Sequence, residues 1–328
     1  MASGKILIIR GGAVGDFIVT LPVFAALRKQ FPSTQLEVVG YPAVTSLALQ
    51  SGLVDAMRPI EARPLASFFA RRGELDPAWS EYFAGFHVIF TYLFDPDEFF
   101  RTNLAKVTKA QVIQGPHRPE EPSATHVTAQ LLAPLQRFAI FDADPVPLLG
   151  TSVGGIGGDA PVGSLPRIAV HPGAGGRHKL WPVSHWSALL ESILERHPVR
   201  LLVVGGEADQ EVVQPLLQRL PPDRVDLMMN RPLTEVAEAL KRCCGFVGHD
   251  SGITHLAAAC GVPGLVLWGP TDAEVWAPNA PWMPRIQAEG GELSCLPVRA
   301  VAAELDRRIP SWLTATSSSN PQPEPGGG

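Results

Sequence analysis

Short apolar runs alternate with longer amphipathic stretches along most of the chain, which predicts strands alternating with helices. Apolar runs of about four to eight residues, bounded by turn residues, are typical of strands buried on both faces of a parallel sheet. The predicted strands, some with the turn that closes them, are residues 5–10, 36–40, 87–93, 110–115, 167–173, 199–206, 245–250 and 263–269. The predicted helices are residues 16–30, a short helix after Pro42, 125–138, 184–196, 207–219, 252–260 and 298–309. Such repeated β-α-β units predict an α/β fold with parallel sheets.

One segment interrupts this alternation and divides the chain. Residues 145–166 are rich in Gly and Pro and nearly free of charge, so we predict a linker there. The predicted domains are 1–155 and 156–312, each Rossmann-like, and residues 313–328 are expected to be a disordered tail. We expect the two parallel sheets to face each other across a cleft, with ligands beyond the carboxyl ends of the strands.

Composition and charge narrow the class of protein. The chain has 328 residues and a formal net charge of −5, which argues against a general nucleic-acid binder, because such proteins carry a basic surplus. The four cysteines show no C-x-x-C spacing, so neither a zinc site nor a redox motif is indicated. The N-terminal apolar run, Ile6–Ile9, is too short for a signal peptide, and no stretch approaches the roughly 20 apolar residues of a membrane span. We therefore expect the protein in the cytoplasm.

The first loop with distinctive chemistry is Gly-rich and joins the first predicted strand to the helix after it. It runs from Arg10 to Asp16 with the sequence Arg-Gly-Gly-Ala-Val-Gly-Asp. Asp16 stands where the helix begins, so its carboxylate has two open interpretations: a helix cap that accepts backbone N–H bonds, or a general base. The dinucleotide fingerprint G-x-G-x-x-G cannot be placed here, because Ala13 and Val14 fall where its second Gly would stand.

A second loop, residues 171–182, follows a predicted strand and combines glycines with cations. The glycines and cations are Gly173, Gly175, Gly176, Arg177, His178 and Lys179. Backbone N–H groups together with a cation suit a phosphate or a diphosphate. The alternative is a solvated turn with an ordinary basic flank.

The third loop joins a strand to a helix through Asp250-Ser251-Gly252. The N-terminus of that helix is a ready anion site, although Asp250 or Ser251 can equally serve as the cap. The nucleophile elbow G-x-S-x-G does not fit, because the serine is misplaced. A metal site is disfavoured too, since His249 and His255 are six residues apart and do not share a helix face.

Taken together and in this order, the loops resemble glycosyltransferase family 9, the ADP-heptose:lipopolysaccharide heptosyltransferases. The resemblance covers about residues 5–310. The matching motifs are Ile9-Arg10 through Gly15-Asp16 with Thr20-Leu21-Pro22, His171-Pro172-Gly173 with Lys179-x-Trp181-Pro182, Asp250-Ser251-Gly252-x-x-His255-Leu256-Ala257-Ala258-Ala259, and Gly269-Pro270-Thr271-Asp272.

The resemblance implies a GT-B fold, with the acceptor side first and the nucleotide-sugar side second. It also implies an inverting reaction that needs no metal and no cofactor. In that reaction Asp16 is the catalytic base that deprotonates the acceptor hydroxyl, and Lys179 neutralises the departing diphosphate. The remaining donor-binding residues that it implies are Gly173, Glu207 at the ribose, Asp250 in the nucleotide pocket, Ser251, Gly252 and Thr254.

The acceptor side has a weaker signature. Members of the family that act on the inner core carry a basic cluster after the third strand, and here Arg58, Arg63, Arg71 and Arg72 occupy that region, spaced apart. The acceptor candidates among them are Arg63, Arg71 and Arg72. We expect these arginines to bind the acceptor, and the alternative is a solvated helix face.

The expected partners are therefore a nucleotide-diphosphate sugar, with ADP-heptose as the expected donor, and a glycan or glycolipid acceptor such as lipopolysaccharide core. Peripheral contact with the inner face of the inner membrane is expected, and no nucleic acid. Two other functions stay open. One is a nucleotide-dependent oxidoreductase, which lacks its fingerprint here. The other is a non-catalytic nucleotide or sugar binder, against which Asp16 and Lys179 argue.

Overall fold

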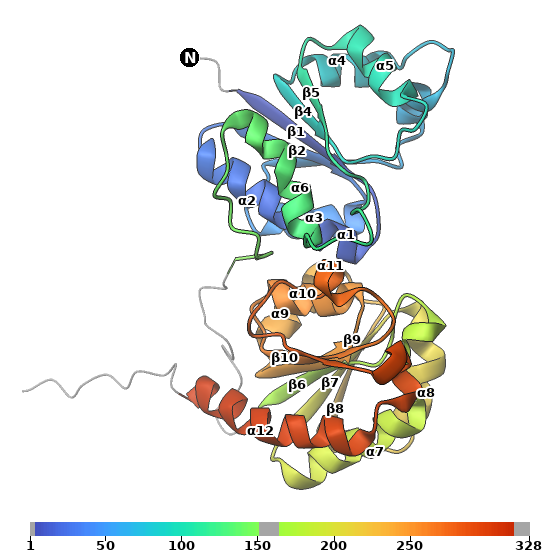
Figure 1. Cartoon of the computed structure of the whole chain (residues 1–328), viewed down its shortest axis with the longest axis vertical. Helices are drawn as coiled ribbons and strands as arrows, with labels where there is room; N and C mark the ends of the chain where they lie inside the picture. The colour runs from blue at the N-terminus through green and yellow to red at the C-terminus, as the bar shows by residue number, and fades with distance from the viewer. Residues whose placement is uncertain (1–3, 151–163, 318–328) are drawn as a thin grey trace, which may run out of the picture. The chain divides into compact units, whose positions relative to one another are not determined.

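The computed structural model describes residues 4–150 and 164–317. The chain divides into two compact units, one of Met1–Leu149 with Glu274–Trp276 and the other of Gly150–Ala273 with Ala277–Gly328. Each unit contains its own sheet, and every strand pairing in both sheets is parallel. The prediction of an α/β fold with two parallel sheets is thus confirmed (Figure 1). Their facing across a cleft stays a prediction.

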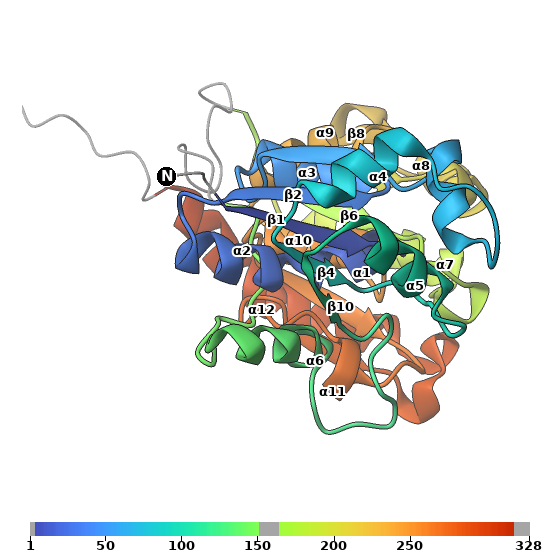
Figure 2. The same ribbon diagram turned by 90° about the horizontal axis from the view of Figure 1, so that it is seen from above.

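The first unit has a five-stranded sheet in the order β3-β2-β1-β4-β5. Figure 2 shows β1, β2 and β4 running side by side. Its strands are β1 (Lys5–Arg10), β2 (Gln35–Gly40), β3 (Ala56–Pro59), β4 (Val88–Thr91) and β5 (Gln111–Gln114). Its helices are α1 (Val14–Ile18), α2 (Leu21–Gln30), α3 (Pro42–Gln50), α4 (Pro77–Ala84), α5 (Phe99–Val107) and α6 (Val127–Leu132), with 3-10 helices η1 (Arg63–Phe69) and η2 (Ala133–Phe138).

The second unit has a six-stranded sheet in the order β11-β10-β9-β6-β7-β8. Its strands are β6 (Arg167–His171), β7 (Arg200–Gly205), β8 (Val225–Met229), β9 (Gly245–His249), β10 (Gly264–Trp268) and β11 (Arg285–Gln287). Its helices are α7 (Val183–Arg196), α8 (Gln210–Leu217), α9 (Leu233–Lys241), α10 (Gly252–Ala259) and α12 (Val298–Ser317). Its 3-10 helices are η3 (Arg177–Lys179), η4 (Glu207–Asp209), η5 (Pro222–Arg224), η6 (Glu289–Gly291) and η7 (Leu293–Cys295). Between β10 and β11 the chain forms α11 (Ala273–Trp276), of which Glu274–Trp276 belong to the first unit.

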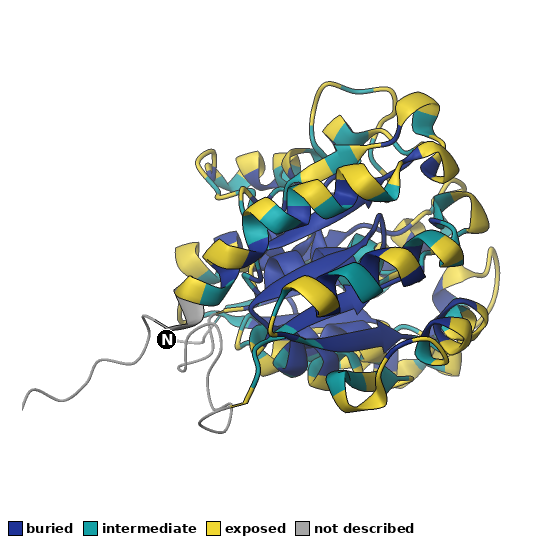
Figure 3. Ribbon diagram, turned by 90° about the horizontal axis from the view of Figure 1, so that it is seen from below, coloured by how far each residue is buried: buried dark blue, intermediate teal, exposed yellow. Residues whose placement is uncertain are grey.

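The central strands are buried almost throughout, because the crossover helices of a parallel sheet pack on its faces. All but the first residue of β1 are buried, and all of β9 and β10. Figure 3 shows these strands in dark blue, with exposed residues on the outer sides of the helices. Among the described residues, no helix is long and apolar enough to cross a membrane.

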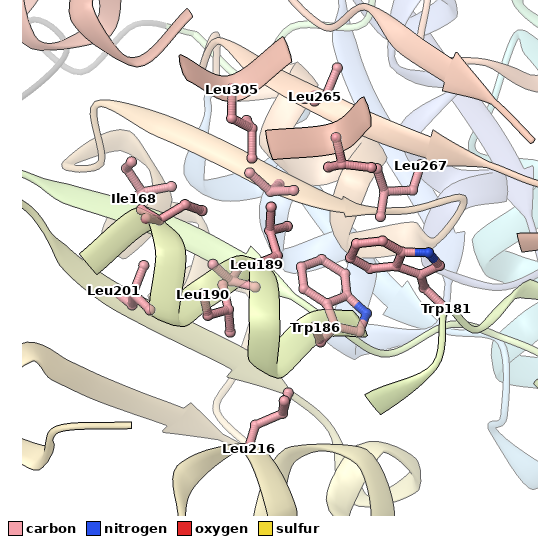
Figure 4. Close-up of a cluster of buried hydrophobic side chains, with 14 of the residues drawn as sticks. Ile168, Trp181, Trp186, Leu189, Leu190, Leu201, Leu216, Leu265, Leu267 and Leu305 are labelled. Atoms are coloured by element: carbon pink, nitrogen blue, oxygen red, sulfur yellow. The ribbon is translucent and has the colours of Figure 1, made fainter. Parts of the chain in front are cut away.

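The core of the second unit is built around two tryptophans. Trp181 and Trp186 lie edge to face, with ring centroids 5.5 Å apart, beneath β10, which carries Leu265 and Leu267 (Figure 4). Leu305 of α12 joins the same cluster, and α12 packs against α7.

The C-terminal helix is longer than predicted. The sequence predicts that it ends at about residue 309, but α12 continues through Pro310 to Ser317. Trp312 is buried in the core, and its indole fills the space beside Gly245, where a Cβ would lie 2.1 Å from the ring. The burial of Trp312 holds the helix past the proline. The predicted tail at 313–328 is therefore wrong for its first five residues, and residues 318–328 lie outside the described residues, as do 151–163 of the predicted linker.

Candidate functional site

The strand order creates one switch point in each unit. In the first sheet β2 and β4 lie on opposite sides of β1, and in the second sheet β7 and β9 lie on opposite sides of β6. The loops that leave the carboxyl ends of β1 and β4, and of β6 and β9, therefore diverge, and such divergence leaves a crevice for ligands. The three loops selected from the sequence follow β1, β6 and β9. The candidate site thus has two parts, one in each unit.

In the first unit, Asp16 lies in the first turn of α1 with its carboxylate folded back over the Gly-rich loop. Oδ2 accepts a hydrogen bond from the backbone N–H of Ala13 at 2.9 Å, and the side chain stays 29 % exposed. Ala13 is the N-cap residue, and Asp16 is the third helical residue, whose side chain reaches back to the N–H of Ala13. Asp16 thus takes part in capping the helix without being the N-cap itself. Gly12 has φ +103°, and a Cβ there would lie 2.7 Å from Oδ2. The loop therefore needs glycine at position 12 to leave room for the carboxylate.

Arg10 ties Asp16 to the neighbouring loops. Its guanidinium is 3 % exposed and donates from Nε and Nη2 to the backbone oxygen of Asp16 at 3.3 and 3.1 Å. Nη1 donates to the backbone oxygen of His117, which follows β5, at 2.9 Å, and Nη2 lies 3.7 Å from Asp16 Oδ1. Burial lowers the pKa of Arg10, and the charge of Asp16 opposes that effect. No role was predicted for Arg10 from the sequence. Its position, as a charged residue at the end of a buried strand, could have indicated one.

In the second unit, the loops after β6 and β9 are joined by an ion pair. Lys179 Nζ donates to Asp250 Oδ2 at 2.6 Å, with the two side chains 24 % and 10 % exposed. These residues are far apart in the sequence, and the neighbouring positions of β6 and β9 bring them together. An ammonium has three N–H donors, so the pair with Asp250 leaves Lys179 able to bind a second anion.

The pair lies next to the start of α10. Ser251 is its N-cap, and Ser251 Oγ accepts from the backbone N–H of Thr254 at 3.3 Å. Thr254 is fully buried, and its hydroxyl donates to the backbone oxygen of His249. Both donors of Thr254 are used inside this turn, so its predicted contact with a ligand is not supported; Thr254 shapes the turn instead. Gly252 begins the helix and is half-buried, and its N–H is one of those that an α-helix leaves without an intrahelical partner.

A buried histidine holds the two loops of this unit in place. His249 Nε2 accepts from the backbone N–H of Trp181 at 3.0 Å and from the indole Nε1–H of Trp186 at 3.2 Å. Because Nε2 accepts, Nδ1 carries the proton and donates to the backbone oxygen of Gly173 at 3.2 Å. Burial lowers the pKa of His249 to about 3, so the ring is neutral. This role was not predicted from the sequence, where His249 was considered only as a metal ligand.

The loop after β7 packs against the same region. Gly173 stands where a Cβ would lie 1.9 Å from Oδ1 of Asp209, so the loop needs glycine there. Oδ2 of Asp209 accepts from the backbone N–H of Gly206 at 2.7 Å. The side chain of Glu207, the predicted ribose ligand, is exposed and makes no hydrogen bond or ion pair with any other described residue. Asp209 is thus a further carboxylate at the edge of this site, and sequence reasoning missed it.

The predicted acceptor arginines lie on the surface of the first unit, at the start of η1 and in the bend after it. Arg63 begins η1, and Arg71 and Arg72 lie in the bend that follows η1, so the alternative of a helix face is wrong for the last two. All three are exposed. Asn103 of α5 donates from Nδ2 to the backbone oxygen of Ala70 at 2.8 Å, which fixes the bend beside α5. Arg58, in contrast, stacks over the ring of Tyr82 with its guanidinium carbon 3.9 Å from the ring centroid.

No metal-ligating cluster stands out in the described part of the chain. Within residues 4–150 and 164–317, no group of three or more His, Cys, Asp and Glu side chains could hold a metal ion. The cation at the second switch point is instead the ammonium of Lys179.

Comparison with known proteins finds similarity to one family. The model of glycosyltransferase family 9 (heptosyltransferase) matches residues 146–306. Lipooligosaccharide heptosyltransferase 2 of Haemophilus influenzae is 30 % identical over 40 % of the chain, and that match spans 39 % of the relative's length. Lipopolysaccharide heptosyltransferase 3 of Escherichia coli is 22 % identical over 92 % of the chain and 98 % of its own length.

The fold is also similar to that of a solved heptosyltransferase structure. The structure of the ADP-heptose lipopolysaccharide heptosyltransferase II of E. coli superposes with a TM-score of 0.76, at 18 % identity, over 94 % of this chain and 99 % of the other. The predicted GT-B fold class is thereby confirmed.

Proposed function

We propose that the chain is a member of glycosyltransferase family 9, and that it transfers a heptose from ADP-heptose to a hydroxyl group of a cell-surface glycan such as lipopolysaccharide core. The observation that carries this proposal is the Lys179–Asp250 pair at the second switch point, beside the N-terminus of α10. A cation and unpaired backbone N–H groups at one point form an anion site suited to a diphosphate. Because of this acceptor class, we propose that the protein acts at the inner face of the inner membrane, in peripheral contact with it.

In the second unit, we propose that Lys179 and the start of α10 bind the diphosphate of the donor. Lys179 stabilises the negative charge that develops on the leaving nucleotide, a role that elsewhere falls to a metal ion. Ser251 and Gly252 supply polar groups at the helix N-terminus, and Asp250 holds the ammonium in position. Gly173 lets the loop approach the nucleotide closely, and Glu207 contacts the ribose.

In the first unit, we propose that Asp16 is the general base. Its carboxylate removes the proton from the acceptor hydroxyl as that oxygen attacks the anomeric carbon. The C–O bond to the acceptor forms on the face opposite the leaving ADP, so the configuration at the anomeric carbon inverts. Arg63, Arg71 and Arg72 bind anionic groups of the acceptor outside the reacting ring.

The donor site predicts that Lys179→Ala weakens binding of ADP much more than binding of adenosine. The ammonium acts on the diphosphate, which adenosine lacks, and its removal also leaves Asp250 facing the phosphates unneutralised. We expect a loss of about tenfold or more in ADP affinity by calorimetry, which is the range of a charge-assisted contact. Lys179→Arg should restore only part of it, because a planar fork differs in shape from a compact ammonium.

Lys241→Ala is the matched control for this experiment. Lys241 lies in the same unit and pairs with Glu238 at 3.1 Å, outside the switch-point loops. Its removal should leave both affinities unchanged. Equal losses of ADP and adenosine binding in Lys179→Ala would remove Lys179 from the phosphate site.

The acceptor arginines predict a salt-dependent effect. The double variant Arg71→Ala/Arg72→Ala should raise the acceptor KM, leave the donor KM unchanged and lose the sensitivity of the acceptor KM to salt. Exposed arginines attract an anionic acceptor through solvent, and dissolved salt screens this attraction. Removing the arginines therefore removes both the attraction and its dependence on salt. Arg137→Ala, an exposed arginine of η2, is the control. Acceptor kinetics unchanged by the double variant would show that the bend takes no part in acceptor binding.

A further inference from the structure

The first unit contains a pocket at the carboxyl end of its sheet that none of the roles above uses. Its volume is about 290 Å³, at the lower end of the range for small-ligand sites and enough for a single sugar ring. The loops after β4 and β5 form its walls, and α5 begins at its rim. The lining residues that matter below are Phe94, Asp95, Glu98, Arg101, Gln114 and His117.

The pocket adjoins the loop that carries Asp16. Leu93 lines the pocket, and its Cδ2 lies 3.6 Å from where a Cβ of Gly11 would be. Arg10 donates both to the backbone oxygen of Asp16 and to that of His117, so one guanidinium spans the base and the pocket wall. A ring held in this pocket therefore lies next to the proposed base.

The walls are held by hydrogen bonds within the unit. Gln114 Nε2 donates to the backbone oxygens of Leu93 at 3.1 Å and Gly115 at 3.0 Å, which joins the two loops. Gly115 packs on Tyr92 so closely that a Cβ would lie 2.2 Å from the ring. These contacts define a preformed pocket, and preformed walls favour binding because little has to be ordered when the ligand enters.

The charges of the lining disfavour an anionic ligand. Two carboxylates, those of Asp95 and Glu98, stand against one guanidinium, that of Arg101, and Glu98 pairs with Arg101 at 2.6 Å. The N-terminus of α5 offers no anion site either, because Asp95 accepts from the backbone N–H groups of Phe100 at 3.1 Å and Arg101 at 2.9 Å. The positive groups at the pocket are therefore already neutralised.

An exposed aromatic ring completes the site. Phe94 is 65 % exposed, and its ring contacts that of His117 with centroids 4.7 Å apart. A large exposed aromatic at the rim of a pocket offers a flat apolar surface, and carboxylates nearby can accept hydrogen bonds from hydroxyl groups. A flat apolar face beside acceptor oxygens matches the C–H face and the hydroxyls of a sugar.

We infer that this pocket binds the reacting ring of the acceptor, that this ring is an uncharged sugar rather than a sugar acid, and that Phe94 is the surface on which it stacks. The inference rests on the proposed function, since it names the substrate class for the acceptor side of the same reaction. Anionic groups elsewhere on the acceptor are left to the exposed arginines beside α5.

The test compares Phe94→Ala with Phe141→Ala, an equally exposed phenylalanine of the same unit outside the pocket. Phe94→Ala should raise the acceptor KM about tenfold, the effect typical of truncating an aromatic anchor, and by the same factor at low and at high salt. The donor KM and ADP binding should not change, and Phe141→Ala should behave as the wild type. An acceptor KM that does not respond to Phe94→Ala would overturn the inference.

A binding measurement without donor tests the charge preference. The methyl glycoside of an uncharged heptose should bind the wild-type protein more tightly than that of a sugar acid of similar size, by ligand-observed NMR. Glu98→Gln should narrow the difference, because it frees the charge of Arg101. Tighter binding of the sugar acid to the wild type would contradict the inference. ADP binding and ADP-heptose hydrolysis are measured on the same samples. Loss of those two activities would show that the proposed function, rather than this inference alone, is wrong.

Discussion

Asp16→Asn is expected to lower the rate of sugar transfer by about 10²- to 10⁴-fold, the usual contribution of a general base. The amide has nearly the shape of the carboxylate and can still accept the Ala13 N–H bond, so α1 should keep its structure. What the variant loses is the ability to take the proton from the acceptor hydroxyl. Single-turnover transfer with saturating donor measures that step directly.

Two controls separate the chemistry from folding and binding. ADP affinity by calorimetry should be unchanged in Asp16→Asn, because the proposed nucleotide contacts are all in the second unit. Asp142→Asn, an exposed carboxylate of the first unit, should transfer at the wild-type rate. Turnover of Asp16→Asn near the wild-type rate would reduce Asp16 to a residue of the helix turn and reopen the interpretation of a non-catalytic binder.

The second large effect is on stability in acid. His249 has a pKa of about 3 in the folded protein and an ordinary value near 6.5 when unfolded. Between those two values the unfolded chain binds a proton that the folded chain does not, so the free energy of unfolding falls as the pH is lowered through this range. The slope from one such group is up to about 1.4 kcal/mol per pH unit. Burial also lowers the pKa of His171, which adds in the same direction.

Urea unfolding at a series of pH values, followed by tryptophan fluorescence, measures this slope. His249→Gln should be less stable at neutral pH, because it loses contacts with Trp181 and Trp186, but should show a shallower slope below pH 6.5. His178→Gln, an exposed histidine of the same loop, should keep the wild-type slope. Equal slopes in all three proteins would mean that His249 titrates as it does in water.

Sequence patterns predict the interior of this fold better than its edges. The central strands are long apolar runs and all were predicted, whereas β3, β8 and β11 were not. Each of these lies at an edge of its sheet, where a short or partly polar strand is sufficient because only one side pairs. The predicted helix at 16–30 is in fact two helices, α1 and α2, which are separated near Thr20, just before Pro22.

The candidate site, too, could be predicted only in part from the sequence. The loops could be located, because glycines, cations and carboxylates cluster at the ends of apolar runs. Their partners could not, because strand order decides which loops meet. Lys179 meets Asp250 only because β9 pairs with β6. Arg10, at the end of β1, meets His117, which follows β5, only because β4 and β5 come after β1 in the order of the sheet. No local pattern distinguished Asp209, which packs beside Gly173, from Glu207, which is exposed.

Transfer of a heptose from ADP-heptose to a glycan hydroxyl can be followed with purified components. The most direct test is to incubate the purified protein with ADP-heptose and a lipopolysaccharide core acceptor that ends in an uncharged sugar, and to follow acceptor mass and free ADP together. The account predicts that the acceptor gains the mass of one heptose and that one ADP is released for each heptose transferred. An acceptor that stays unmodified, with no ADP released from ADP-heptose although the protein binds ADP, would contradict it.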